Sequence, residues 1–415
     1  MKTWISYLAA TALGLAATLL FGESLAFTQT MLTFTAFFVQ VGGFLLIPLA
    51  FVGFSSGVAS LRKDAKGGVL TRTTIIWSIL STLLLAFAGA AVFRFFPVNF
   101  PASSSAGGNP QMLAGLIPHS FLQLLPQGMA SNPFYTLVRI DGFLLPLLLV
   151  ALFFGYFLKP NMEVIRPAYV TMNSFSEVMF RMARAYSAAG FLFVFFAAGY
   201  WFSHMQMEGT LFVATQFLLT LIGATLGVLL ILLPLLLAIV SGFRVNPYKI
   251  LIRMLAPAIA GLFTANIFFT TPMTMSLSRH NAGAQKRVSG TAVPLYTIIG
   301  RGGSAMIASF STLSLVYAAS GELPGLQVLV AVAAASAALA YLSPLYLGME
   351  VFFISLATLQ VLEVSLYGAE MTLIAMIPLL NGLGVLIDSY IAAFGAAYTT
   401  ERMGVRIENS YRDIV

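Results

Sequence analysis

The sequence has no cysteine among its 415 residues, which excludes disulfides, thiolate metal sites and cysteine nucleophiles. Histidine is also scarce: His119, His204 and His280 are scattered, and we expect each to be a loop or interface residue and not a metal ligand. A nucleotide-binding glycine loop of the Walker type is missing as well. The chain is therefore not expected to be an enzyme or an ATP-driven pump.

Charged residues are few. Only 8% of the residues are charged, whereas 59% are hydrophobic and the mean hydropathy is +0.93. A water-soluble domain could not bury so much apolar surface in one core, so the composition predicts an integral membrane protein. A helix needs about 20 residues to cross ~30 Å of hydrocarbon, and most apolar stretches are long enough, which predicts a polytopic helical bundle. The stretches lie near residues 4–21, 31–61, 73–96, 142–158, 187–202, 211–243, 254–275, 291–317, 326–357 and 372–400.

The N-terminal stretch MKTWISYLAATALGLAATLLFG combines a lysine, an apolar run and small residues. This combination fits either a cleaved signal peptide or a first membrane span. Because the apolar part is already long enough to cross the bilayer, we expect a span.

The net charge of +7 does not indicate a nucleic-acid partner, because the basic residues are not gathered on one face. They are concentrated in a few connections, which the positive-inside rule places in the cytoplasm, whereas residues 95–138 have no Lys or Arg and are expected outside. The charges thus predict a multi-pass protein of the cell (inner) membrane with both termini cytoplasmic. The basic connections contain Arg62, Lys63, Lys66 and Arg72; Lys159, Arg166, Arg181 and Arg184; Arg244, Lys249 and Arg253; Arg279, Lys286 and Arg287; and Arg402, Arg406 and Arg412.

The apolar segment from Leu251 to Gly283 begins and ends with basic residues, so both of its ends are expected in the cytoplasm. A segment that leaves and returns on the same side is a re-entrant hairpin. Its expected tip holds Asn266, Thr270, Thr271 and Pro272, polar or helix-breaking residues that hydrocarbon tolerates only if they line a cavity or pack on protein.

A second interrupted segment runs from Gly325 to Leu366 and is broken between Leu342 and Glu350. We expect it to be a hairpin that enters from the outside. Two interrupted segments of opposite orientation indicate a secondary transporter built from inverted repeats, with its site near the bilayer midplane.

Several motifs resemble those of the dicarboxylate/amino-acid:cation symporter family, which includes the excitatory amino-acid transporters and archaeal aspartate transporters. The resemblance runs through nearly the whole chain. It rests on IPLAFVGFSSGVASL (47–61), WSILSTLLLAFAGAAVFRFFP (77–97), TTPMTM (270–275), AVPLYTIIGRGGSAM (292–306) and NGLGVLIDSYIAAFGAAYTTERMG (381–404).

The resemblance implies an all-α polytopic membrane protein with eight transmembrane helices, two re-entrant helical hairpins and inverted repeats, assembled as a homotrimer and working as an elevator. Residues 1–72 (spans one and two) and 139–207 (spans four and five) are expected to form a static scaffold. Span three (73–96) and residues 208–415 are expected to form the moving transport domain, with 97–138 as an outer loop. Within 208–415 we expect span six, a first hairpin at about 249–280, span seven at about 288–320, a second hairpin at about 325–366 and span eight at about 370–403.

The motifs depart from the family where solute and sodium bind. The family has N-M-D-G-T in its seventh span, where this chain has residues 300–304, and S-S-S at the first hairpin tip, where this chain has residues 266–268. Of the polar residues on successive turns of the last span, only Asp388 remains, and it aligns with the aspartate that holds the substrate amino group in the family. The usual substrate and ion stoichiometry therefore does not carry over.

Arg301 lies in the middle of an apolar span, where a charge costs about 2.5–3.5 kcal/mol on insertion scales, so it needs a partner. The resemblance places Asp388 and Glu350 near it. In one interpretation the guanidinium replaces a bound cation and can also bind a substrate carboxylate, with a proton on Glu350 or Asp388 as the coupling ion. In the other, the ion pair is structural in a carrier that has lost its old function.

The leading functional prediction is a secondary active symporter of a small organic solute, an amino acid or a dicarboxylate. The alternatives are a proton-coupled or uncoupled carrier of a different solute, and a non-transporting scaffold, sensor or anion conduit of the same fold. Besides the solute, the expected partners are the lipid bilayer and two further copies of the chain, and the only expected cofactor is sodium or a proton as coupling ion.

Two sets of residues are the candidates for binding, and no catalytic residue or resident metal is expected. The hydroxyls among them have an alternative role, because serine and threonine commonly bond to the preceding turn of their own helix. The substrate candidates are Asn266, Thr270, Thr271, Arg301, Ser304, Glu350 and Asp388, and the cation candidates are Ser81, Thr82, Gly300, Gly302, Gly395 and Thr399.

Overall fold

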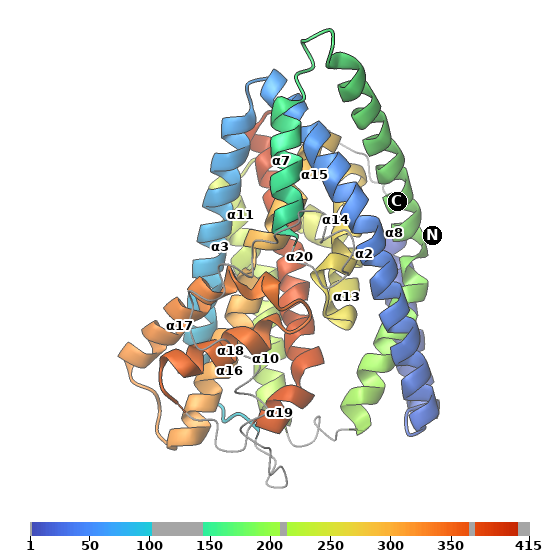
Figure 1. Cartoon of the computed structure of the whole chain (residues 1–415). Helices are drawn as coiled ribbons and strands as arrows, with labels where there is room; N and C mark the ends of the chain where they lie inside the picture. Colours follow the sequence, from blue (N-terminus) through green and yellow to red (C-terminus); the bar gives the residue numbers. More distant parts are fainter. Residues whose placement is uncertain (1, 102–143, 208–213, 365–369, 406–415) are drawn as a thin grey trace.

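The computed structural model describes residues 2–101, 144–207, 214–364 and 370–405, which form a helical bundle (Figure 1). The helices, in chain order, are α1 (Thr3–Phe21), α2 (Leu25–Lys63), α3 (Gly67–Phe95), α7 (Leu145–Phe157), α8 (Arg166–Met207), α10 (Thr215–Gly227), the π-helical turn η2 (Val228–Leu232), α11 (Leu233–Ser241), α12 (Pro247–Arg253), α13 (Leu255–Thr264), α14 (Ile267–His280), α15 (Lys286–Ile299), α16 (Gly302–Ser320), α17 (Leu326–Ala340), the 3-10 turn η3 (Ser343–Leu345), α18 (Glu350–Val361), α19 (Glu370–Ala375) and α20 (Ile377–Arg402).

Seven helical segments in the described ranges are long and apolar enough to cross a membrane, one fewer than the sequence predicted. They are α1, α2, α3, α8, the continuous run from α10 to α11, the run from α15 to α16, and α20. The span expected near 142–158 is α7, whose 13 residues are only about 20 Å long at 1.5 Å per residue. Most of the predicted outer loop (97–138), with His119, lies outside the described residues.

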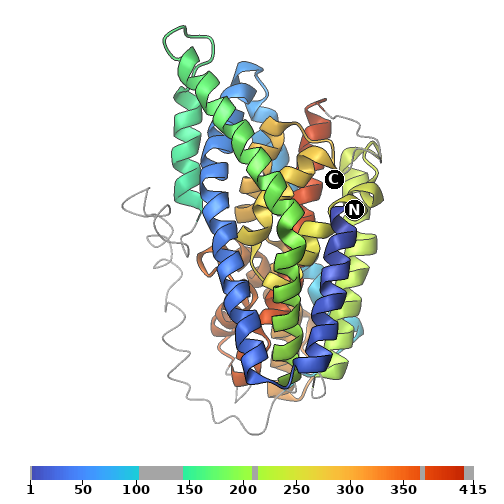
Figure 2. The same cartoon turned by 90° about the vertical axis from the view of Figure 1, so that its right-hand side faces the viewer.

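Helices α1, α2, α7 and α8 pack on one another along one side of the bundle (Figure 2). Helices α2 and α8, with 39 and 42 residues, are longer than a span requires. The exposed faces of α1, α2 and α8 carry large apolar side chains such as Leu13, Phe44 and Leu192, which suits contact with lipid.

The remaining helices form a second group around α16 and α20. Helix α3 packs on α16 and α17, and α13 packs on α20, which runs through the centre of the bundle (Figure 1). Nearly all side chains of α16 and α20 are buried. A helix that is buried all round belongs to the core, so these two helices form the centre of the molecule.

The predicted interruption in residues 251–283 occurs at Ala265 and Asn266, between α13 and α14. Ala265 adopts a left-handed conformation with φ +49°, which ends α13. The side-chain oxygen of Asn266 then accepts hydrogen bonds from the backbone N–H groups of Phe268 (2.9 Å) and Phe269 (3.2 Å) and caps α14. Each arm has at most 14 residues, so neither is long enough to cross a bilayer.

The second interruption separates α17 from α18 at residues 341–349, where the chain makes a 3-10 turn and reverses at Gly348 with φ +80°. Only glycine adopts this conformation without strain, which explains the residue at that position. Helices α17 and α18 lie in the lower half of Figure 1, whereas α14 lies in its upper half.

Candidate functional site

Arg301 lies in a break between α15 and α16. Helix α15 ends at Ile299 and α16 begins at Gly302, so Gly300 and Arg301 are outside both helices. The flanking glycines allow a close approach to α20, since a Cβ atom at Gly303 would lie 2.5 Å from the carbonyl oxygen of Gly384. This break in the helix places the arginine in the centre of the molecule with 0% of its surface exposed.

Both carboxylates named from the sequence contact this guanidinium. Its Nη2 forms an ion pair with Oε1 of Glu350, and its Nη1 lies 3.5 Å from Oδ2 of Asp388. The side chains of Glu350 and Asp388 are 0% and 1% exposed. Three segments that are distant in the sequence therefore converge here: the α15–α16 break, the start of α18 and the middle of α20.

Asp388 is held at the N-terminus of α16. Its Oδ1 accepts hydrogen bonds from the backbone N–H groups of Gly303 (2.7 Å) and Ser304 (3.4 Å), and its Oδ2 accepts one from the Ser304 hydroxyl (2.7 Å). A helix N-terminus carries partial positive charge and unsatisfied N–H groups, so it stabilises an ionised carboxylate. Asp388 therefore has stabilising partners besides the arginine.

Glu350 occupies the first turn of α18, and a residue that the sequence analysis did not select positions it. The Asn381 side chain donates a hydrogen bond from Nδ2 to Oε2 of Glu350 (3.1 Å) and accepts one from the backbone N–H of Val351 (2.8 Å). Asn381 lies two helical turns before Asp388 on the same face of α20, and this seven-residue spacing was the available signal. It links the glutamate to the helix that carries the aspartate.

The formal charges of the three buried side chains do not sum to zero. With both carboxylates ionised, Arg301, Glu350 and Asp388 together carry one negative charge. Nε and Nη1 of Arg301 have no hydrogen-bond partner among the described residues. Because buried N–H groups are normally satisfied, this part of the guanidinium has capacity for a further acceptor, and a carboxylate is the group that arginine binds best.

The first-hairpin candidates lie next to this cluster and already have partners. The Thr270 hydroxyl donates to the Ile267 carbonyl (3.0 Å) and lies 3.4 Å from the Ser389 hydroxyl, which belongs to the neighbour of Asp388. The Thr271 hydroxyl donates to the same carbonyl (2.7 Å) and lies 3.0 Å from the Thr297 hydroxyl. Asn266 thus lies at the break, whereas Thr270, Thr271 and Pro272, which the sequence predicted at the hairpin tip, lie inside α14. Thr270 is linked to the cluster through Ser389, the neighbour of Asp388.

Aromatic side chains contact two of the cation candidates, Gly395 and Thr399. A Cβ atom at Gly395 would lie 2.5 Å from Cζ of Tyr296 and 2.7 Å from Cδ1 of Trp77. The Thr399 hydroxyl is 3.1 Å from the Tyr296 hydroxyl, and the Ser81 hydroxyl donates to the Trp77 carbonyl at 2.7 Å. The space that a hydrated or ligated ion needs next to Gly395 is therefore filled by side chains.

The remaining cation candidates are dispersed. The backbone N–H of Gly300 donates to the Tyr296 carbonyl (2.8 Å), and Gly302 packs against the Ser81 carbonyl. The buried hydroxyl of Thr82 has no hydrogen-bond partner among the described residues. Within those residues there is also no cluster of three or more His, Asp or Glu side chains that could hold a metal ion.

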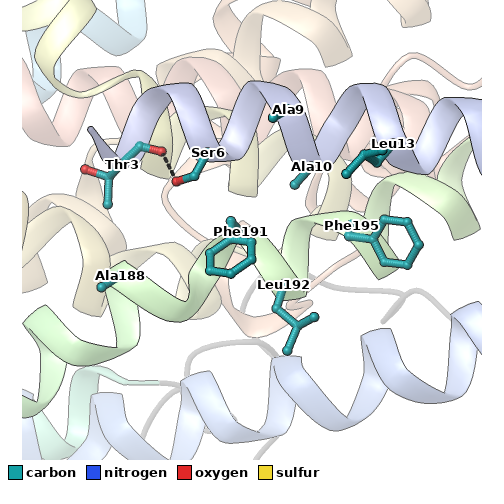
Figure 3. Close-up of a pocket in the computed structure, with 9 residues that line it drawn as sticks. All are labelled: Thr3, Ser6, Ala9, Ala10, Leu13, Ala188, Phe191, Leu192 and Phe195. Atoms are coloured by element: carbon teal, nitrogen blue, oxygen red, sulfur yellow. Dashed lines mark hydrogen bonds between the residues drawn. The ribbon is translucent and has the colours of Figure 1, made fainter. Parts of the chain in front are cut away.

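An apolar pocket of about 500 Å³ lies between α1 and α8, and none of the candidate binding residues lines it (Figure 3). Ala10, Leu13, Phe191 and Phe195 line it, and the Ser6 hydroxyl donates to the Thr3 carbonyl (2.7 Å). Its lining has no charged side chain that could bind a carboxylate or a cation. It therefore contributes nothing to solute recognition.

A comparison with curated proteins gave no match. A family profile described as "Sodium:dicarboxylate symporter family" matches residues 3–395, which is nearly the whole chain. The chain therefore belongs to the sodium:dicarboxylate symporter family.

Proposed function

We propose that this protein carries a small carboxylate-bearing solute, an amino acid or a dicarboxylate, and that a proton and not sodium is its coupling ion. Membership of the family makes the chain a multi-pass membrane transporter and not an enzyme. The observation that supports a carboxylate-bearing solute and a coupling proton is the fully buried Arg301, which lies between two carboxylates at a helix break.

The net charge of the cluster gives a reason for coupling. A solute carboxylate that binds Arg301 would raise the local charge from one to two negative charges, which is costly in a buried site. A cation must therefore enter with the solute. Protonation of Glu350 or Asp388 is the simplest way to supply it, because these carboxylates already lie beside the guanidinium.

Crowding around the cation candidates supports a proton over sodium. The Tyr296 and Trp77 rings leave no room beside Gly395, and the hydroxyls of Ser81 and Thr399 already have partners. The tethered charge of Arg301 takes the electrostatic role that a bound cation would have.

Access to Arg301 depends on the second interrupted segment. Glu350 follows directly after the turn at residues 341–349, so a movement of this turn would withdraw its carboxylate from Arg301. A solute carboxylate could then take the place of Glu350 on the guanidinium. In this mechanism Glu350 closes the site when the solute is absent.

The packing supports the two-part architecture that an elevator mechanism needs. Helices α1, α2, α7 and α8 pack mainly on each other, and α14 and α15 contact α2 across a boundary where glycines approach closely. A Cβ atom at Gly290 would lie 2.9 Å from the Gly53 carbonyl oxygen, so the backbones of α2 and α15 approach closely at this boundary. We assign the first group, as the scaffold, to a homotrimer, with residues 73–96 and 208–415 as the moving part.

Uptake into proteoliposomes tests the proposal. Radiolabelled amino acids and dicarboxylates are offered with a sodium gradient, with a proton gradient, or with neither. We expect uptake driven by the proton gradient, unchanged by sodium, and lost in Arg301→Asn. Arg94→Gln, which changes an arginine at the end of α3, is the control. Uptake that depends on sodium, or that persists in Arg301→Asn, would contradict the proposal.

A non-transporting membrane protein of this fold is the second candidate. It is favoured by the hydrogen bonds that Asp388 receives from Gly303 and Ser304, which give this carboxylate a structural role. If a wide panel of solutes shows neither binding nor gradient-driven uptake, this candidate is preferred.

A further inference from the structure

A polar cavity of about 390 Å³ lies at the opposite end of α15 from Arg301, where α2 ends and α8 begins. It lies between these two helices and the connection from α14 to α15. Its lining includes Ser60 on α2, Asn173 on α8, and the basic residues Arg279, Lys286 and Arg287.

Two carboxylates hold the basic side chains in place. Nη1 of Arg279 donates hydrogen bonds to both carboxylate oxygens of Glu177 (3.1 and 3.0 Å), and Nζ of Lys286 lies 3.6 Å from Oε2 of the same residue. Arg287 forms an ion pair with Asp64. The side chains of the three cations are only 21–27% exposed, so they are fixed around the cavity and not extended into solvent.

Positive charge remains in excess after these pairings. Three lining cations, Arg279, Lys286 and Arg287, face two carboxylates, so one positive charge is uncompensated at the cavity. Each guanidinium carries five N–H groups and the ammonium three, which leaves donors for another acceptor. The first turn of α15, which begins at Lys286, adds the positive end of a 14-residue helix.

We propose that this cavity binds a phosphate ester, either the headgroup of an anionic lipid or a soluble phosphate. Three converging cations and a helix N-terminus suit the several oxygens and the charge of a phosphate group. Basic pockets between membrane helices on the cytoplasmic side bind lipid headgroups by this chemistry. The Ser60 hydroxyl and the Asn173 side chain supply neutral polar groups in the same lining.

The bound anion would connect two parts of the structure. Ser60 and Asn173 belong to α2 and α8, whereas Arg279, Lys286 and Arg287 belong to the α14–α15 connection. Around the cavity, the contacts across this boundary include the pairs to Glu177 and Asp64 and a hydrogen bond from Lys286 Nζ to the Asn173 carbonyl (3.1 Å). A phosphate between them would stabilise this relative position of the two parts.

Thermal unfolding of the full-length protein in detergent tests the site, because a ligand that binds only the folded state raises Tm. The three tryptophans report unfolding. The probes are inorganic phosphate, dihexanoyl phosphatidic acid and dihexanoyl phosphatidylcholine, each titrated below micelle formation. A saturable rise in Tm with phosphatidic acid alone assigns a lipid headgroup, and a rise with inorganic phosphate as well assigns a general phosphate site. No saturable rise with either anion overturns the proposal.

Two variants locate the site. In Lys286→Gln/Arg287→Gln we expect apparent affinity for the effective anion to fall at least about tenfold, because two charge-assisted contacts are lost. Lys249→Gln, an exposed cation on α12, should leave the affinity unchanged. Ser60→Phe fills the cavity from α2 without changing charge and should also abolish binding, which keeps the test valid if the double variant does not fold. Equal binding in wild type and Ser60→Phe, or equal weakening in Lys249→Gln, overturns the proposal.

Discussion

Arg301 and Glu350 form an ion pair in which both side chains are 0% exposed. The pair connects the break between α15 and α16 to the first turn of α18, 49 residues further along the chain. Removing one partner of such a pair leaves an uncompensated charge in the core, whereas removing both does not. The first two predictions use this asymmetry.

Arg301→Gln should be strongly destabilising. The change leaves Glu350 and Asp388 without a cation, and losing one partner of a buried ion pair costs about 3–5 kcal/mol. Adding Glu350→Gln should recover part of the loss, because only Asp388 then remains charged and it keeps its bonds to Gly303 and Ser304. A double-mutant cycle of Tm values measures this coupling. Additive effects of the two changes would show that the ion pair contributes no coupling energy.

Glu350→Gln should strengthen the binding of an anionic solute. The change brings the net charge of the cluster from one negative charge to zero and removes the carboxylate that competes for Arg301, so we expect affinity to rise about tenfold. Uptake should also respond less to the proton gradient. Glu363→Gln, an exposed carboxylate that follows α18, is the matched control and should behave as wild type. Unchanged affinity in Glu350→Gln would exclude competition between Glu350 and the solute.

Asn381→Ala should affect both stability and transport. It removes the hydrogen bond to Glu350 and the acceptor for the Val351 N–H, for a loss of about 1–3 kcal/mol. Asn246→Ala is the matched control, because Asn246 also caps a helix, accepting from Tyr248 (3.1 Å) and Lys249 (3.2 Å), but at an exposed position. Chemical denaturation and proton-driven uptake should be measured for both. If the two variants change uptake equally, Asn381 has only a capping role.

Gly395→Ala should destabilise the protein by about 1–3 kcal/mol, because the new Cβ would overlap the rings of Tyr296 and Trp77. Gly223→Ala is the control, since no atom lies within 4 Å of the corresponding Cβ position on α10. In that exposed helix alanine should be neutral or stabilising by about 0.5–1 kcal/mol. Thermal unfolding distinguishes the two variants. A Gly395→Ala protein as stable as wild type would show that the space beside Gly395 is open.

Local sequence patterns predicted the helical segments and the places where they break. Asn266 and the residues around Gly348 are helix-capping or turn residues in otherwise apolar runs, and their effect is local, so they could be recognised without the fold. The count of eight spans is tested only in part. Seven lie within the described residues, and α7, in the stretch near 142–158, begins directly after residues 102–143, which lie outside the described ranges.

The candidate site was predicted in part. Arg301 could be named because a charge in an apolar span is rare and needs a partner, and the family resemblance placed Glu350 and Asp388 near it. Asn381 was missed, because an amide has no such requirement and its two contacts join α18 to α20. The filling of the space at Gly395 was also missed, because a glycine in the sequence does not reveal which side chains approach it.

The sequence by itself determined that this chain lies in a membrane, where its helices are interrupted, and that one arginine must be neutralised within the bilayer, because hydropathy and helix breaking depend on neighbouring residues. Only the tertiary structure decided that two carboxylates contact this arginine and that both lie at helix N-termini. It also decided that the Tyr296 and Trp77 rings fill the space beside Gly395. Those outcomes depend on the approach of α16, α18 and α20 to within a few ångströms, which packing sets and residue order does not reveal.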